Sequence, residues 1–119
     1  MPYNIKGTGL DITDELRSYV EKGLSHSEKF LHKEPVKVDV ELEYVPAREG
    51  ERNRAECTVA VGGTVHRTER WAESMHAAID LATGDLAQEL GRDKERRVDA
   101  MRHEGAAIKD QLRGLDTEL

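Results

Sequence analysis

Apolar residues recur at every second position over two stretches of this chain, with acidic or polar residues between them. From 36 to 44 the intervening positions include Asp39, Glu41 and Glu43, which predicts a strand with one buried and one acidic, hydrated face. The stretch from 54 to 61 predicts a neighbouring strand of the same kind. Its residues expected to face the core are Ala55, Cys57, Val59 and Val61.

A further strand is predicted from 64 to about 70. It follows Gly62-Gly63, a pair that permits the positive φ angles of a tight hairpin turn. Val65 is expected to face the core, but Arg67 and Glu69 share its face and interrupt the apolar pattern. Either this end of the strand extends past the helices, or the two charged side chains pair with each other.

Two stretches carry the three-and-four spacing of an amphipathic helix. Thr13 precedes the first with a side-chain oxygen suited to cap a helix N-terminus, and Pro35 follows its end. Ser74 precedes the second in the same way. The apolar stripe of the first helix includes Leu16, Tyr19, Val20, Leu24 and, near its expected end, Phe30 and Leu31. The stripe of the second includes Met75, Ile79, Ala82, Leu86 and Leu90.

A short strand from 3 to about 6 precedes the first helix, so the predicted order is β-α-β-β-β-α, an α+β domain. The length of 119 residues fits one domain with a small appendage. Cys57 is the only cysteine, and the chain shows no secretory signal and no apolar span, so we expect a cytoplasmic protein without membrane contact. The formal net charge of −6 argues against nucleic-acid binding through bulk charge. Binding of that kind requires local basic patches.

Catalytic and metal-binding motifs are missing from the sequence. It contains no His-Glu-x-x-His, Cys-x-x-Cys or Gly-x-Ser-x-Gly, and the five histidines lack a metal-ligand spacing. We therefore expect no enzyme activity, no metal, no cofactor and no small-molecule substrate. Cys57 is interpreted as a small core residue.

Basic residues are segregated on the first helix. Lys22, Lys29 and Lys33 fall on one flank with His26 beside them, while acidic residues occupy the opposite flank. One interpretation is an ordinary solvated helix surface. The other is a stripe that faces phosphates, which segregation favours because mixed signs would cancel the local field.

Several motifs, taken together and in order, resemble the ribosome hibernation factors, the family of hibernation-promoting factor and protein Y. The resemblance covers about the first 96 positions. It rests on Asn4-Ile5, Asp11-Ile12-Thr13-Asp14-Glu15-Leu16, Glu28-Lys29, Gly62-Gly63-Thr64-Val65-His66 and Met75-His76-Ala77-Ala78-Ile79-Asp80-Leu81-Ala82.

This resemblance implies a four-stranded sheet with both helices on one face, like a double-stranded-RNA-binding domain. It also implies a non-catalytic protein that docks in the small ribosomal subunit, where mRNA and tRNAs run, and keeps ribosomes idle under stress or in stationary phase. The partners would be ribosomal RNA and ribosomal proteins. The expected RNA-contacting residues are Lys22, His26, Lys29, Lys33, His66, Arg67, Arg70, Arg92, Lys94, Arg96 and Arg97.

Departures from the family pattern reduce the positive charge. Asp85 and Gln88 stand where the family's second helix has basic residues, and His26 replaces a common lysine. Residues 1–96 carry 14 basic and 19 acidic side chains. An alternative is therefore an acidic relative that regulates through protein contacts, in transcription or by self-association.

Trp71 and the tail leave two further alternatives open. Trp71, expected between the last strand and the second helix, either covers an edge of the core or stacks on an exposed ribosomal base. We assign 1–96 to the ribosome-binding domain and 97–119 to an amphipathic tail, which is either frayed or a helix that pairs with a second copy. The tail positions with heptad spacing are Val98, Met101, Gly105, Ile108, Leu112, Leu115 and Leu119.

Overall fold

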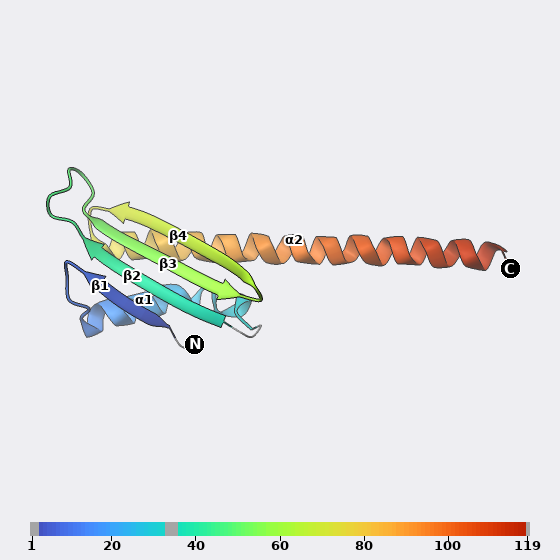
Figure 1. The fold of residues 1–119 in the computed structure, drawn as a ribbon, viewed down its shortest axis with the longest axis horizontal. Helices are drawn as coiled ribbons and strands as arrows, with labels where there is room; N and C mark the ends of the chain where they lie inside the picture. The colour runs from blue at the N-terminus through green and yellow to red at the C-terminus, as the bar shows by residue number, and fades with distance from the viewer. Residues whose placement is uncertain (1–2, 33–35, 119) are drawn as a thin grey trace.

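The computed structural model describes residues 3–32 and 36–118, with side chains described up to Ala100. Its elements are β1 (Asn4–Thr8), α1 (Asp14–Ser25), the 3-10 helix η1 (Glu28–Phe30), β2 (Val36–Tyr44), β3 (Asn53–Val61), β4 (Thr64–Ala72) and α2 (Met75–Glu118) (Figure 1). This order confirms the predicted α+β fold. Lys33 and Pro35 lie outside the described residues.

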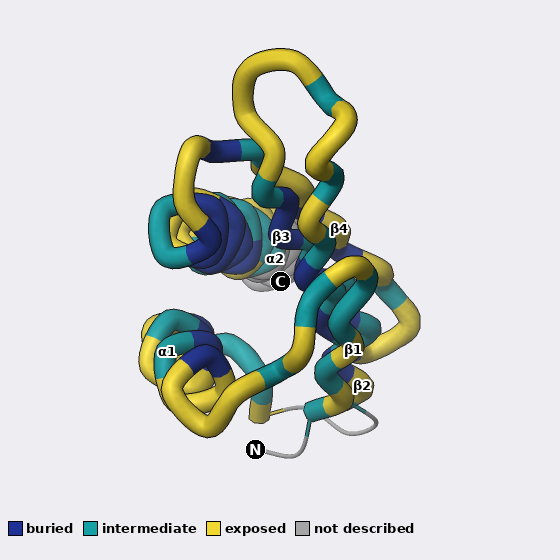
Figure 2. Tube along the Cα trace, turned by 90° about the vertical axis from the view of Figure 1, so that its left-hand side faces the viewer, coloured by how far each residue is buried: buried dark blue, intermediate teal, exposed yellow. Residues whose placement is uncertain are grey.

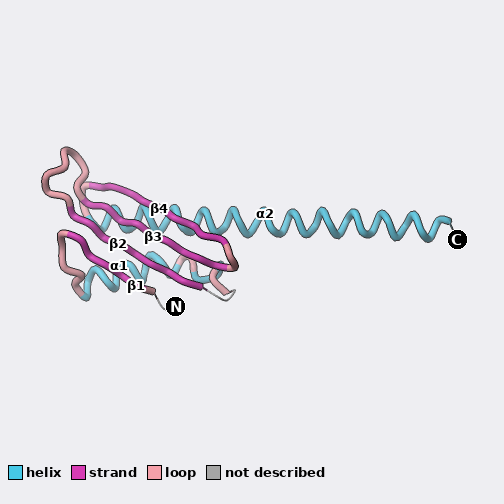
Figure 3. Tube along the Cα trace, in the orientation of Figure 1, coloured by secondary structure: helices cyan, strands magenta, loops and turns pink. Residues whose placement is uncertain are grey.

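The four strands form one sheet in the order β1-β2-β3-β4 (Figure 3). β1 runs parallel to β2, while β2, β3 and β4 are antiparallel neighbours. Val61 pairs with Thr64 across a turn of only two residues, Gly62 and Gly63, whose φ angles are +56° and +81°. Two consecutive positive φ angles define a tight primed turn, as the glycine pair predicts.

Both helices lie on one face of the sheet, and the buried positions of the backbone face the space between them (Figure 2). Most of the predicted inward residues of β2, β3 and both helices are buried in the core; Tyr19, Phe30, Leu31 and Val36 are partly buried against it, and Tyr44 is 37% exposed. Each helix begins where its cap was expected: Thr13 Oγ1 accepts a hydrogen bond from Leu16 N at 3.2 Å, and Ser74 Oγ accepts one from Ala77 N at 3.1 Å. The largest fully buried side chains are Leu24, Leu42, Ile79, Leu86, Val20, Val38 and Val59.

The first helix is shorter than its apolar stripe suggests. α1 ends at Ser25, where Ser25 Oγ donates a hydrogen bond to Lys22 O at 2.5 Å, and the chain tightens into η1. Phe30 therefore reaches the core from a 3-10 turn instead of a last helical turn. This turn places Phe30 and Lys29 beside α2.

The predicted orientation of β4 is wrong. Val65 is 65% exposed, whereas His66, Thr68 and Ala72 are buried beneath the helices. The strand's inward face is partly polar: Thr68 Oγ1 donates to Ala82 O at 2.9 Å, and His66 Nδ1 lies 3.3 Å from Glu89 Oε1.

Arg67 and Glu69 lie on the open face of the sheet and pair with β3 instead of with each other. Arg67 is 2.8 Å from Glu56, and Arg54 is 3.4 Å from Glu69.

α2 continues through the predicted boundary at 96/97 as one uninterrupted helix and extends past the end of the sheet (Figure 1). This extension gives the molecule its length of 75 Å against 28 and 19 Å in the other directions. The side chains predicted to pair in the tail lie outside the described side chains, Val98 excepted, and Leu119 lies outside the described residues. Pairing of the tail stays a prediction.

Candidate nucleic-acid interface

The end of α1 and the middle of α2 enclose a surface cleft of about 500 Å³, here called the α1–α2 cleft, lined by Ser25, His26, Lys29, Phe30, Ala87 and Gln88. Next to this cleft, α1 and α2 approach each other closely at Gly23 and Thr83. A Cβ placed on Gly23 would lie 2.6 Å from Thr83 Oγ1, so glycine is what allows this approach. On the α2 side, the small side chain of Ala87 lines the cleft.

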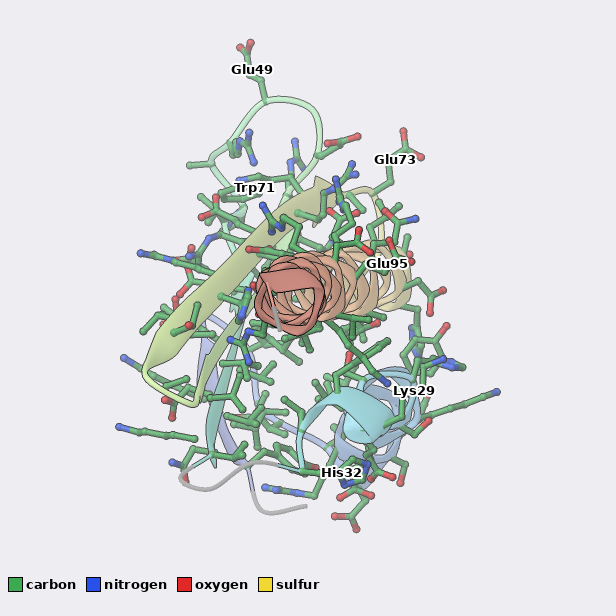
Figure 4. The ribbon with its side chains drawn as sticks, turned by 90° about the vertical axis from the view of Figure 1, so that its right-hand side faces the viewer. Lys29, His32, Glu49, Trp71, Glu73 and Glu95 are labelled. Atoms are coloured by element: carbon green, nitrogen blue, oxygen red, sulfur yellow. The ribbon has the colours of Figure 1, made fainter. Side chains whose placement is uncertain are left out.

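Two lysines from different elements lie near one aromatic ring, that of Phe30, which borders this cleft. Lys29 Nζ lies 5.2 Å and Lys94 Nζ lies 5.9 Å from the centre of the Phe30 ring. Both distances fall in the range in which an ammonium is attracted by a ring face. A Cβ on Gly91 would lie 3.4 Å from the ring, so the helix passes close to Phe30 at this point. In Figure 4, Lys29 lies on the side of α2 that faces α1.

A second hollow, of about 270 Å³, continues from Phe30 toward the tail. Its walls include Val61, Leu90 and Val98, with Lys94 and His32 among the other lining residues. The sequence prediction missed Phe30 as a site residue, because its position in an apolar stripe marked it as core. A signal for Phe30 was available in the adjacent Lys29, because a predicted RNA-contacting residue next to Phe30 lies beside the same helix, α2.

The described ion pairs divide the predicted basic residues into two groups. Arg67 pairs with Glu56 at 2.8 Å, Arg70 with Asp85 at 2.6 Å, and Arg97 with Asp93 at 2.9 Å. Within the described part of the chain, no carboxylate lies within ion-pair distance of the others. This second group comprises Lys22, Lys29, Arg92, Lys94 and Arg96, all of them exposed. Lys29 thus presents positive charge at the α1–α2 cleft, Lys94 presents it at the adjoining hollow beside Phe30, and Lys22 lies in the last turn of α1.

His66 is not available for RNA contact, contrary to the prediction. Its side chain is 4% exposed and lies between β4 and α2, with Nδ1 3.3 Å from Glu89 and Nε2 3.7 Å from Asp93. The inverted face of β4 explains the error, because His66 takes the inward position that was expected for Val65. His66 thus links β4 to α2 through its contacts with Glu89 and Asp93.

Arg67, Arg70, Arg92 and Arg96 line a different groove from Lys29, of about 870 Å³, between β4 and the outer flank of α2. Carboxylates from the same two elements, such as Asp85 and Glu89, also line it. The groove therefore carries both signs of charge, unlike the α1–α2 cleft. The predicted basic set is divided between two surfaces instead of forming one.

Trp71 lies within β4, not between the strand and α2, and it belongs to the open face of the sheet. Its ring is covered by the guanidinium of Arg48, whose Cζ lies 3.4 Å from the ring centre, and its Nε1 donates to Glu69 at 3.1 Å. Figure 4 shows Trp71 and Lys29 on opposite sides of α2. Base stacking by Trp71 would thus occur on a different surface from phosphate contacts by Lys29.

The open face of the sheet is organised by Arg54, which sequence reasoning overlooked as an alternating polar position. Its guanidinium is 2.7 Å from Glu41 and 3.6 Å from Glu43, and it also contacts Glu56 and Glu69. The hydrogen bond from Arg54 lowers the pKa of Glu41 and the pKa of Glu69. Four carboxylates surround this cation, and Lys6 and Arg67 also pair with Glu41 and Glu56, so the face carries both signs of charge with a small acidic excess.

The described residues contain no group of three or more His, Cys, Asp or Glu side chains arranged to hold a metal ion. Cys57 is fully buried, and burial raises the pKa of its thiol to about 11. Among the described helices, none has a stretch apolar enough, over sufficient length, to cross a membrane.

Solved structures define the class of this fold. The N-terminal domain of Thermus thermophilus Protein Y superposes with a TM-score of 0.66 at 32% identity, covering 76% of this chain and 94% of that domain. A ribosomal subunit interface protein from Coxiella burnetii, 19% identical, shares the fold with a TM-score of 0.63 over 80% of this chain and 99% of that one. The chain is thus an α+β domain of the Protein Y kind.

The chain belongs to the Sigma 54 modulation protein / S30EA ribosomal protein family, whose model matches residues 3–98. The resemblance to the ribosome hibernation factors is confirmed. A ribosome hibernation promotion factor from Picosynechococcus is 33% identical over 100 residues, covering 83% of this chain and 52% of that protein. A ribosome hibernation promoting factor from Azotobacter vinelandii is 31% identical over 99 residues, covering 83% of this chain and 88% of that protein.

The lengths of the relatives differ. This chain spans about half of the Picosynechococcus protein and 55% of a Bacillus subtilis ribosome hibernation promotion factor that is 29% identical over 107 residues. It spans most of the Azotobacter protein. The matched region in each case is the α+β domain.

Proposed function

We propose that this protein binds the small ribosomal subunit in the channel for mRNA and tRNAs, and that it keeps ribosomes idle under stress. Family membership supports ribosome association. The observation that carries the mode of binding is the convergence of Lys29 and Lys94 on the Phe30 ring, which borders the α1–α2 cleft, without a carboxylate within ion-pair distance of either lysine among the described residues. Cations that no carboxylate neutralises can contact phosphates at the lowest cost in lost ion pairs.

The contacts proposed at this cleft involve phosphates, which position a protein without reading base sequence. Lys22 and His26 extend the same surface along α1, and both side chains are exposed. A plug that fills a channel requires shape and charge more than base recognition. The acidic open face of the sheet would then point away from ribosomal RNA.

The test is co-sedimentation with small ribosomal subunits across a salt series. Lys29→Glu/Lys94→Glu should weaken binding and reduce the slope of log affinity against log salt by roughly one per lost contact. The matched control is Lys6→Glu/Lys37→Glu, which changes the net charge equally on the open face of the sheet. Equal losses in the two variants would show that overall charge acts, and would reject the cleft as the contact surface.

A second candidate function is regulation through protein contacts made by the tail. The observation that favours it is the length of α2, which reaches Glu118 well beyond the sheet while its sequence keeps heptad spacing. In this hypothesis the tails of two copies pair. Leu112→Lys/Leu115→Lys should then convert a dimer to a monomer in light scattering, because unpaired charge is disfavoured in an apolar seam. A wild type that stays monomeric at high concentration would remove this candidate.

A further inference from the structure

β4 is a border strand of the sheet. It pairs with β3 on one side, and no strand among the described residues pairs with its other side (Figure 3). The strand has nine residues, Thr64–Ala72, which is long for an unpaired edge. An edge strand presents main-chain donors and acceptors that can pair with another strand.

The hairpin turn determines which main-chain groups point outward. Across a two-residue turn, Val61 and Thr64 form a hydrogen-bonded pair, and hydrogen-bonded and non-bonded pairs then alternate along the ladder. The N–H and C=O groups that point away from β3 therefore belong to Val65, Arg67, Glu69 and Trp71. The side chains of the same four residues project onto the open face of the sheet.

The space beside this edge is open. The 870 Å³ groove is bounded by β4 residues from Arg67 to Arg70 and by the outer flank of α2. A neighbouring strand lies only about 4.8 Å away in a sheet, so the groove has room for one. α2 packs against both β3 and β4.

We propose that β4 pairs with β4 of a second copy of this chain, antiparallel, about a two-fold axis at Thr68. In this register Val65 lies opposite Trp71 of the second copy, and Arg67 lies opposite Glu69 of the second copy. Residues with outward main-chain groups face each other throughout, which gives about eight main-chain hydrogen bonds. The two cross-strand pairs are apolar–aromatic and oppositely charged, both of which are favourable.

Neighbouring registers are rejected by charge or by hydrogen bonding. An axis at Arg67 would place that residue opposite itself, and an axis at Glu69 would do the same for two carboxylates; like charges directly opposite are destabilising. An axis between two residues would place residues whose main-chain groups point outward opposite residues whose groups point toward β3. The hydrogen-bond ladder could then not form. The register about Thr68 pairs all four outward residues of the strand and places unlike charges opposite each other.

Charges on an edge strand usually guard it against pairing. Here the edge carries one charge of each sign, each already next to an opposite charge on β3: Arg67 beside Glu56 and Glu69 beside Arg54. Pairing through Thr68 extends this alternation across the two copies. The charges of Arg67 and Glu69 thus disfavour pairing in the neighbouring registers and pairing with other strands, but they favour pairing about Thr68.

The proposed dimer differs from tail pairing in its geometry. A two-fold axis through the middle of β4 makes the two α2 helices antiparallel, so the tails extend in opposite directions (Figure 1). The tails of one such dimer cannot meet. The proposal is also independent of ribosome binding, because it is measured on the protein alone and leaves the α1–α2 cleft open.

Sedimentation velocity of the full chain across a concentration series tests the proposal. Arg67→Glu and Glu69→Arg should each raise the dimer dissociation constant about tenfold or more, since each places like charges opposite one another twice. The combined Arg67→Glu/Glu69→Arg variant should restore it to within about threefold of wild type. Val65→Pro removes an outward N–H at a position that an edge tolerates, and should weaken the dimer as well.

Circular dichroism at each concentration confirms that the variants are folded, and the restoring double variant excludes a general loss of stability. Leu112→Lys/Leu115→Lys is the control that should leave this dimer unchanged. Three results would overturn the proposal: a monomeric wild type at all concentrations, a dimer that only the tail variant dissociates, or charge reversals that the double variant does not compensate. A monomer that instead takes up an added extended peptide at β4 would also reject the second copy as the occupant.

Discussion

Arg54→Met should be among the most destabilising single changes on the open face of the sheet. Arg54 is only 9% exposed, and its guanidinium contacts Glu41, Glu43, Glu56 and Glu69 from three strands. Methionine keeps much of the side-chain volume, so the change removes the charge and leaves four carboxylates next to one another. Removal of one partner from a buried charge network costs more than the network itself contributes.

The magnitude follows from burial. Loss of a buried cation costs about 3–5 kcal/mol, but the carboxylates around Arg54 keep partial access to water, which screens their repulsion, so we expect about 2–3 kcal/mol. For a domain of this size that corresponds to a drop of roughly 10–20 °C in melting temperature. Arg67→Met is the control: its side chain is 64% exposed with one partner, and the expected loss of stability is much smaller than for Arg54→Met.

The pH dependence gives an independent check on the cause. Arg54 lowers the pKa of Glu41 and of Glu69, so in the folded state both stay ionised below their usual range. The stability from these groups is present above the unfolded pKa, about 4.3, and is lost as pH falls through the folded values. The gap between wild type and Arg54→Met in urea unfolding should therefore be present at pH 7 and close as the pH falls below the unfolded pKa of about 4.3. A gap that is constant with pH, or no larger than that of Arg67→Met, would refute the reasoning.

Three other measurements test the packing. Gly23→Ala should cost about 1–3 kcal/mol, because the new methyl group would meet Thr83 at 2.6 Å, whereas Gly84→Ala has nothing within 4 Å and should stabilise the helix by about 0.5–1 kcal/mol in the same thermal melts. Cys57 should resist iodoacetamide at pH 8 until the protein unfolds, as its buried thiol has a pKa of about 11. Trp71→Ala should lower the melting temperature without changing ribosome affinity per folded molecule, and the reverse result would favour base stacking.

The sequence predicted the element order, both helix caps and the glycine turn, because each depends on neighbours within a few positions. The face of β4 could not be predicted in the same way. Val65 is the most apolar residue of that strand, yet His66 and Thr68 are inward, since α2 supplies partners for their polar atoms. Those partners are 14 or more positions away along the chain, and local alternation contains no information about them.

The candidate site required the same long-range information. The sequence predicted a single basic surface, and which of its members keep an unneutralised charge depends on pairs such as Arg70 with Asp85, 15 positions apart on different elements. Phe30 was missed for a related reason. Its place in an apolar stripe predicted a core residue, but α1 ends at Ser25, and the following turn brings Phe30 beside Lys94. A basic residue is informative about binding only once its partners are known.

The net charge of −6 is a weaker objection to RNA binding than the sequence alone suggests. Four of the carboxylates, Glu41, Glu43, Glu56 and Glu69, lie around Arg54 on the open face of the sheet, on the opposite side from the helices. Fields of exposed charges are screened within about 8 Å at physiological salt, so carboxylates across the sheet scarcely reach the α1–α2 cleft. What matters there is the local balance: Lys29 lines the cleft without a carboxylate among the other lining residues, and Lys94 lies beside the adjoining Phe30 ring. This local positive charge would orient the protein with the cleft toward RNA.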